Sequence, residues 1–480
     1  MDLRITRLFG FVFVLFAVLA GFTAWWAVLD AEQLKGERAN KRPLFEAQRI
    51  KRGTIRASDG TVIAESNPVG EGESRRFIRE YPLGELFGHP VGYSFAEQGS
   101  SEFERYHDQT LTGKGNEVDD FLQEISGEPP AGNPMSTALD VGAQQTALDL
   151  LAGQPGSVVA IEPATGKVRV AASIPAYDPN LVPDSLKDLN SDPAAPLLDR
   201  STQGQYPPGS TFKLVTAAAA LDSGAIDSST LIDSPATIDV QGNPLSNFGG
   251  ATFGSIDIET ALTNSVNTFF ARLGEQIGSD TLFEYMDRFG FGSKPPIDLP
   301  PDELSVSGVF EEGSLVRPDD GVDVGRIAIG QERLLVTPLQ MAQVAAAIAN
   351  RGVLMKPRIW TTIRDRDGRL VSRMEPATQS EVIGPETAAE LTQAMTAVVG
   401  EGTGTAAALY GIDVAGKTGT AEVPGRADCA GLPNQAWFVG FAPADRPEVA
   451  VAATVECTSG TGGTVAAPIA AGVMQELLGE

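Results

Sequence analysis

The sequence predicts a mixed α/β protein in which two domains follow a single N-terminal transmembrane helix. Three observations carry this prediction. An uncharged apolar run extends from Leu8 to Leu29, about as long as the roughly 20 residues that cross a bilayer. The roughly 450 residues after it exceed what one hydrophobic core usually holds. Residues 46–133 are rich in Gly, Glu and Arg, whereas the chain beyond them carries an Ala-rich helical stretch and short apolar strands.

The apolar run is expected to stay as a membrane anchor. It ends in Trp25 and Trp26, which suit a membrane interface, and it is preceded by Arg4 and Arg7, which fit a cytoplasmic start. A cleaved signal peptide is the alternative. The anchor is favoured because the run is long for a signal core and no small-x-small pair follows it. Everything after residue 30 is then expected outside the membrane.

The domain boundary is expected near Gly153-Gln154-Pro155. Long apolar runs are scarce before this boundary, which favours an extended, non-catalytic α/β pedestal. The apolar stretches after it favour the catalytic domain. The expected parts are a cytoplasmic N-terminus over 1–7, the transmembrane anchor over 8–29, the pedestal over 30–154 and the catalytic domain over 155–480.

Composition excludes several classes of function. With 36 basic and 62 acidic residues, the formal charge of −26 makes nucleic acid a poor partner. The two histidines, His89 and His107, lie far from the serine described next, which argues against a Ser-His-Asp triad. No HExxH string, Cys/His cluster, P-loop or GxGxxG string occurs, so no metal and no cofactor is expected.

Ser210 and Lys213 form the first candidate catalytic pair. A turn, Tyr206-Pro207-Pro208-Gly209, precedes the Ala-rich stretch 210–220, so the serine is expected to open a buried helix. Three residues apart, the two side chains share one face of the first turn. Burial and a nearby cation would both lower the pKa of Lys213, which would let a neutral amine act as base. The alternative is a capping serine followed by a snorkelling lysine.

Ser265-Val266-Asn267 is the second candidate. It lies between two apolar stretches and is expected to join two core helices, with Ser265 and Asn267 on one side of a loop. A hydroxyl there can pass a proton to a leaving amine, and an amide can donate to and accept from a peptide. The alternative is an asparagine whose hydrogen bonds serve only the helix junction.

Lys417-Thr418-Gly419-Thr420 is the third candidate, and it is expected to be a strand. Gly419 would let a ligand backbone approach closely. Thr418 and Thr420 would face the cleft, where two hydroxyls beside the Lys417 cation suit a substrate carboxylate. The amides of Thr420 and Ser210 would hold a developing oxyanion.

These three strings, once each and in this order, resemble the S-x-x-K, S-x-N and K-T-G elements of penicillin-binding proteins. The resemblance extends over nearly the whole chain from Arg52 and is closest to class B, the monofunctional transpeptidases. No second long region precedes the transpeptidase part to house a glycosyltransferase, which excludes the bifunctional class A type. The further segments that carry the resemblance are Arg52-Gly53-Thr54-Ile55, Asp59-Gly60, 156–166, 173–180, 336–342 and 436–443.

The resemblance implies an α+β fold with a central antiparallel sheet and helices on both faces. It also implies a serine D,D-transpeptidase that cross-links peptidoglycan stem peptides and is acylated by β-lactams. Ser210 would attack the carbonyl between the two terminal D-alanines, with Lys213 as base, Ser265 as proton relay and Asn267 orienting the peptide. Two departures fall in the pedestal, where the family has Asp-Arg at Ala57-Ser58 and Gly-Leu-Glu at 102–104.

Among class B proteins, the modest length and simple pedestal most resemble the shorter actinobacterial members, one of which acts in cell division. The resemblance implies a SEDS-family glycosyltransferase as a partner in the membrane. Three rival functions make different demands on the sequence. A β-lactamase would need a deacylating glutamate, and no E-x-x-L-N string is present. A β-lactam sensor would need a cytoplasmic domain or several membrane spans. A catalytically silent cell-wall scaffold has no chemical need for a serine and lysine pair.

The only cysteines are Cys429 and Cys457. A hairpin that turns near Ala444-Asp445 would place Cys457 opposite a position near 432, with Cys429 close by. Outside the cytoplasm a disulfide that clamps this hairpin is one expectation, and two free thiols are the other.

Overall fold

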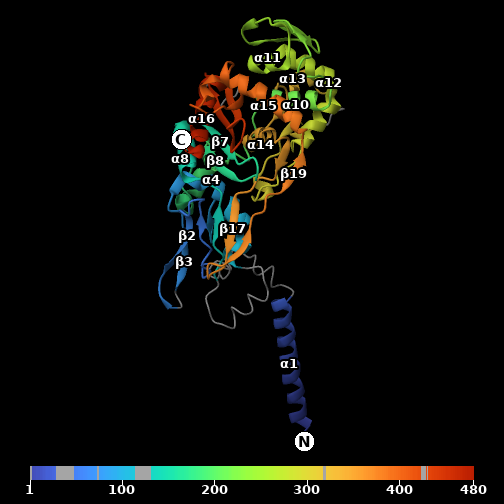
Figure 1. The fold of residues 1–480 in the computed structure, drawn as a ribbon. Coiled ribbons are helices and arrows are strands. Elements are labelled where there is room, and N and C mark those ends of the chain that lie inside the picture. The colour runs from blue at the N-terminus through green and yellow to red at the C-terminus, as the bar shows by residue number, and fades with distance from the viewer. Residues whose placement is uncertain are drawn as a thin grey trace.

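The computed structural model describes residues 3–28, 48–72, 75–113, 131–316, 321–422, 429 and 431–479. The described chain forms an N-terminal helix, a sheet-rich part and a larger part in which helices cover a second sheet (Figure 1). The N-terminal helix, α1 (Leu3–Val28), is exposed along its described side chains. Its window Arg4–Thr23 has a mean hydropathy of 2.2 with no residue buried. At 1.5 Å per residue a helix of 26 residues is about 39 Å long, enough to span a hydrocarbon core.

The sheet of the N-terminal part has six strands and draws on distant segments of the chain. Two strands from residues 360–373 form one side of the sheet. The inner one of them pairs with β6 (Met135–Thr137), and β6 pairs in turn with the strand near residue 55. Only β1 and β6 run parallel. The strand order is β18 (Leu370–Arg373), β17 (Trp360–Arg364), β6 (Met135–Thr137), β1 (Ile55–Arg56), β2 (Val62–Val69) and β3 (Arg76–Glu80). The boundary at 154–155 stays a proposal, and this sheet crosses it.

A buried carboxylate holds the N-terminal part together. Glu104 of α5 (Glu102–Tyr106) is inaccessible and binds two arginines, with Oε2 at 2.8 Å from Arg52 Nη2 and Oε1 at 2.6 Å from Arg79 Nε. Burial alone would raise the pKa of this carboxyl, but the arginines, Arg79 foremost, bring it below its ordinary value. Arg79 Nη1 also donates to the Gly53 carbonyl at 2.9 Å. Glu104 therefore joins three segments of the pedestal.

Glu102 explains one departure from the family. Its φ is +50°, a region that glycine enters without strain. The side chain is buried, and Oε1 accepts a hydrogen bond of 3.0 Å from Gln203, seven residues before Ser210. Burial and then the nearby Asp199 raise the pKa of Glu102 well above its ordinary value. The side chain that replaces glycine here therefore contacts the larger part of the molecule.

The second sheet is antiparallel throughout, and helices cover both of its faces, as expected (Figure 1). Neighbouring residues of β7 alternate between two cores: Val159 packs toward α14 (Pro338–Ala349), and Val158 packs toward α8 (Val141–Leu151) and α16 (Ala467–Leu478). The strand order is β20 (Ala415–Glu422), β21 (Asn434–Ala442), β22 (Val449–Thr458), β7 (Gly156–Ile161) and β8 (Val168–Ile174).

Among the other helices, α15, η4 and η9 contact the edge strand β20. The expected helix over 210–220 divides into a 3₁₀ turn, η4 (Gly209–Phe212), and α10 (Lys213–Asp222), whose residues 213–220 are all buried. Further helices are η2 (Gly84–Phe87), α4 (Gly88–Val91), α6 (Asp108–Thr112), η3 (Pro179–Leu181), α9 (Val182–Ser191), η5 (Phe248–Gly250), α11 (Ile258–Thr263), α12 (Asn267–Arg288), η6 (Pro301–Glu303), α13 (Val324–Ile327), α15 (Pro385–Gly400), η7 (Thr405–Ala407) and η9 (Gly462–Ala466). Short strands are β4 (Ser94–Phe95), β5 (Gly99–Ser100), β9 (Ile232–Ser234), β10 (Thr237–Val240), β11 (Asn243–Ser246), β12 (Gly254–Ile256), β13 (Gly308–Glu311), β14 (Ser314–Leu315), β15 (Leu334–Leu335), β16 (Val353–Met355) and β19 (Thr378–Glu381).

The expected hairpin is formed by β21 and β22. Ala442 pairs with Val449, and an irregularity between Asn434 and Ala436 shifts the far end, where Asn434 lies opposite Thr458. Cys457 therefore lies near 434, two residues from the expected partner position. A disulfide joins Cys457 to Cys429, which ties the connection between β20 and β21 to the neighbouring strand.

Candidate active site

The S-x-x-K segment packs directly against the edge strand β20. Gly209 has a φ of +53°, and a Cβ built on it would lie 2.9 Å from the Thr420 carbonyl oxygen. On the strand, a Cβ at Gly419 would lie 2.8 Å from the Pro208 carbonyl oxygen. The sequence predicted that Gly419 leaves room for a ligand backbone. In the structure the S-x-x-K turn makes such a close approach, so Gly419 brings η4 and β20 together, and its approach to a ligand stays a prediction.

Lys213 is the most heavily bonded member of the site. Its Nζ donates to the Ser265 carbonyl at 2.8 Å and to Asn267 Oδ1 at 2.7 Å, and it lies 3.4 Å from Ser265 Oγ. The side chain is fully buried. A neutral amine has two N–H donors and one lone pair, so these two acceptors use both donors and leave the lone pair free. The two shorter contacts are thus compatible with a neutral Lys213.

The electrostatics point the same way. Burial lowers the pKa of Lys213 well below its ordinary value, and the neighbouring Lys417 lowers it further, the direction that the sequence predicted. Burial also lowers the pKa of Lys417, to about 7. Burial and the neighbouring cation thus favour the uncharged form of Lys213, while Lys417 is still partly protonated near neutral pH. One lysine is suited to accept a proton and the other to bind an anion.

Ser265 lies between the two lysines. It follows α11 with a φ of +55°, and its Oγ accepts a hydrogen bond of 2.9 Å from Lys417 Nζ. Asn267 begins α12, and its Nδ2 donates to the Ser246 carbonyl at 3.0 Å while its Oδ1 accepts from Lys213. Because the protein uses both halves of this amide, Asn267 positions the lysine here. Its second Nδ2 hydrogen is still available to a peptide, and the role in orienting one stays a prediction.

The two threonines of β20 alternate with Gly419 and so share one face of the strand. Thr418 Oγ1 lies 2.6 Å from Thr403 Oγ1, and Thr420 Oγ1 accepts from the Gly462 amide at 3.1 Å. Sequence reasoning missed Thr403 and Gly462. The only local signal was the string Gly402-Thr403-Gly404, and a glycine at 402 is needed because a Cβ there would lie 2.5 Å from the Thr263 carbonyl oxygen.

Ser210 is the free group of the site. It is half-buried, and the hydrogen bonds found across the described residues include none from its Oγ. Catalytic hydrogen bonds often tighten only when substrate binds. The structure thus brings Lys213, Ser265, Asn267 and Lys417 into one bonded cluster at the start of α10, with the Ser210 hydroxyl left available. Among the described residues, no group of three His, Cys, Asp or Glu side chains could hold a metal ion.

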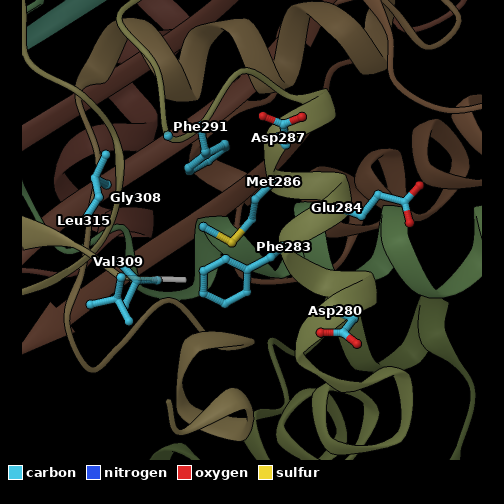
Figure 2. A pocket seen from close by; sticks show the side chains of 11 residues that line it. Asp280, Phe283, Glu284, Met286, Asp287, Phe291, Gly308, Val309 and Leu315 are labelled. Atoms are coloured by element: carbon cyan, nitrogen blue, oxygen red, sulfur yellow. The ribbon is translucent and has the colours of Figure 1, made fainter. Parts of the chain in front are cut away.

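A cavity of about 700 Å³ is lined by residues outside this centre (Figure 2). Phe283, Met286 and Phe291 line it from α12 and the segment that follows, and Val309 faces them from β13. None of its lining residues belongs to the three catalytic strings. Phe291 makes an edge-to-face contact with Phe212, at 5.8 Å between ring centroids, so the cavity wall supports the S-x-x-K turn from behind.

Two family models match the chain. The model described as the penicillin-binding protein transpeptidase domain matches residues 156–475, and the model described as the penicillin-binding protein A dimerisation domain matches residues 52–135. Together they account for most of the chain after the N-terminal helix.

Individual proteins match over almost the full length. The peptidoglycan D,D-transpeptidase PbpA of Mycolicibacterium smegmatis is 34% identical over 98% of this chain and 97% of its own length. Penicillin-binding protein A of M. tuberculosis, solved as a ceftriaxone acyl-enzyme complex, is 34% identical with a TM-score of 0.80, covering 91% of this chain and 100% of that one. A D,D-transpeptidase domain from Eggerthella lenta is 34% identical with a TM-score of 0.78, covering 90% and 99%.

Proposed function

The chain belongs to the class B penicillin-binding proteins and is a peptidoglycan D,D-transpeptidase, in which we propose that Ser210 carries the acyl group. Ser210 Oγ attacks the carbonyl between the two terminal D-alanines of a stem peptide, and Lys213 takes the hydroxyl proton. The C–N bond breaks, and the departing D-alanine amine takes up a proton through Ser265. An amine from a second stem peptide then attacks the ester, forms the cross-link and returns the proton to Ser210.

Binding of the donor peptide is assigned to β20. Lys417 supplies a cation, and Thr418 and Thr420 supply hydroxyls for the terminal carboxylate. The amides of Ser210 and Thr420 are assigned to the oxyanion, since Gly209 and Gly419 let the two backbones approach closely. A β-lactam presents a carboxylate and a reactive carbonyl in the same relation, so it acylates the same serine.

One observation carries these assignments. Two fully buried lysines lie on either side of the Ser265 hydroxyl, at 2.9 and 3.4 Å, and one of them, Lys213, follows Ser210 by three residues. A buried lysine without an ion pair is costly in a merely structural role. This cost is understandable where a neutral amine and a cation are both needed for catalysis.

The function is tested by mixing the full-length protein with un-cross-linked glycan polymer that carries pentapeptide stems. Release of D-alanine together with cross-linked dimer supports transpeptidation, and prior treatment with penicillin should abolish both products. Release of D-alanine without any dimer would mean hydrolysis. No release at all, from protein that still binds penicillin, would favour the scaffold.

Replacement of Lys213 by methionine is expected to slow acylation by penicillin by about 10²–10⁴-fold, because general-base catalysis is lost. Methionine matches the length of the buried stem, so the protein should fold. The rate is read from the time course of fluorescent penicillin labelling. Lys187→Met on α9 is the matched control and should label at the parent rate. Labelling of Lys213→Met at the parent rate would remove Lys213 from the role of base.

Acylation by carboxylate-bearing β-lactams is expected to fall above neutral pH. The pKa of Lys417 is about 7, so deprotonation removes the cation that binds the carboxylate. The second-order rate constant should drop at least about tenfold between pH 7 and 9. Lys417→Arg keeps its charge at those pH values and should lose this decline. A rate constant that stays level to pH 9 in the parent protein would contradict the role given to Lys417.

We further propose that α1 anchors the protein in the cell membrane and that residues after 30 lie outside the cytoplasm. The length and apolar surface of α1 support the anchor, and the Cys429–Cys457 bond fits an oxidising compartment. Protease added outside intact spheroplasts should then degrade the catalytic domain. Protection of this domain from the external protease would mean that it lies on the cytoplasmic side and would contradict the proposed topology.

For the partner, we propose a SEDS-family glycosyltransferase that contacts α1 and the pedestal, in a complex that acts in cell division. The uncovered apolar surface of α1, which includes Phe9, Phe13 and Phe16, supports a helix contact within the membrane. A photo-crosslinker at Phe13 should capture such an enzyme from cells. Capture of lipid alone would count against this partner.

A further inference from the structure

A second cavity opens from the catalytic centre itself. It measures about 340 Å³, and Ser265 lines it together with Thr403, Glu401, Phe248 and Phe253. Ser265 is the residue whose hydroxyl accepts from Lys417, and Thr403 bonds to Thr418 of β20. A molecule in this cavity would therefore touch Ser265 and lie next to the Thr403–Thr418 contact on β20.

The wall formed by α15 is negatively charged. Glu401 is the C-terminal cap of α15, where the helix dipole is negative, and the last turn holds no basic residue. The ion pairs of the described residues include none with Glu401, which is exposed. A carboxylate at a helix C-terminus repels anions and attracts cations. This wall therefore favours a positively charged group beside a centre that otherwise carries lysines.

The two substrates of a transpeptidase differ in the charge that they bring to the centre. The donor ends in a carboxylate, which the negative wall would repel and which Lys417 and the threonines of β20 already suit. The acceptor brings an amine on an aliphatic side chain. Phe248 is 89% exposed on the cavity rim, in the turn η5, and Phe253 lies half-buried behind it. Aromatic faces of this kind suit an aliphatic stem that ends in a cation.

We propose that this cavity binds the acceptor stem peptide, with Glu401 holding its side-chain ammonium and Phe248 packing on the aliphatic stem. The inference rests on the proposed function and names the second substrate site of the same centre. The ammonium releases one proton to solvent, and the amine nitrogen then attacks the Ser210 ester. The C–N bond forms, the C–O bond breaks, and the second amine proton passes to Ser210 Oγ. Glu401 itself is unchanged by the reaction.

The test uses the full-length protein and a thioester donor, in which a thiol analogue of D-alanine is the leaving group. The acceptor is a synthetic stem peptide with a free side-chain amine. Each acyl-enzyme gives either hydrolysed donor or coupled peptide. The ratio of these two products therefore measures acceptor binding separately from donor binding. For Glu401→Gln we expect the acceptor concentration at half-maximal coupling to rise about tenfold, as expected for loss of one charge-assisted contact. The rise should be smaller at high salt. Glu390→Gln, an exposed glutamate on the same helix, is the matched control.

The outcomes separate this inference from the proposed function. If neither protein is acylated by the donor, the proposed function fails. If Glu401→Gln is acylated and couples the acceptor with the parent's half-saturation, the acceptor site fails alone. A rise in the donor concentration needed for acylation, with an unchanged partition, would instead place the donor in this cavity and overturn the assignment. Phe248→Ala should raise acceptor half-saturation too, which gives a second variant, in a different segment of the cavity lining.

Discussion

Replacement of Ser210 by alanine is expected to abolish covalent labelling by penicillin, with a loss of at least about 10⁴-fold in acylation rate. The hydroxyl is the only group at this position that can form the ester, and no neighbouring residue can replace it in the reaction. Stability should change by less than about 1 kcal/mol, because the serine is half-buried and makes no capping hydrogen bond in η4.

The measurement is labelling with fluorescent penicillin together with thermal unfolding of the same preparation. Ser223→Ala, at the other end of α10, is the matched control and should label normally. Labelling of Ser210→Ala at a rate near that of the parent would mean that another residue carries the acyl group. A large loss of stability would mean that Ser210 also has a structural role.

Replacement of Glu104 by alanine should have the largest effect on stability, about 3–5 kcal/mol. It leaves Arg52 and Arg79 buried without their shared carboxylate. The pKa of Glu104 is lowered in the folded protein, so its contribution is complete above the ordinary carboxyl pKa of 4.5 and is lost as the pH falls through the lower folded value. Acid should therefore weaken the parent protein more than the variant.

Urea unfolding at pH 7 and at lower pH measures both effects. Asp108→Ala is the control, because Asp108 also pairs with Arg52 but has a side chain that is 51% exposed, and it should cost less than about 1 kcal/mol. Equal losses for the two variants would show that the buried pairing of Glu104 has no special weight. Penicillin labelling of Glu104→Ala under native conditions reports whether the pedestal influences the active site.

Local features of the sequence predicted which candidate side chains lie together. Ser210 and Lys213 are three residues apart, which predicts that their side chains share one face of a helical turn. The Ala-rich stretch after them explains why the lysine is buried. The alternation along β20 gives the common face of Thr418 and Thr420. Each of these features depends on neighbours within a few residues, which a sequence pattern records directly.

Features that depend on distant segments were not predictable in the same way. Thr403 and Glu401 reach the centre because the C-terminal end of α15 packs beside α11, more than 130 residues earlier in the chain. The pairing of β17 with β6 likewise joins segments over 200 residues apart. No local pattern marks such pairings. The close approach of the S-x-x-K turn to Gly419 was not predictable for the same reason, since the two segments lie about 200 residues apart.

The central claim is that Ser210 is the acylated nucleophile of a transpeptidase. The most direct test is to label the full-length protein with fluorescent penicillin, measure its intact mass, map the labelled peptide and follow the lifetime of the adduct. We expect one adduct, on the peptide that contains Ser210. Its lifetime should be much longer than the time that a β-lactamase needs for one turnover. An adduct on another residue, no adduct, or an adduct that is rapidly hydrolysed would contradict the account.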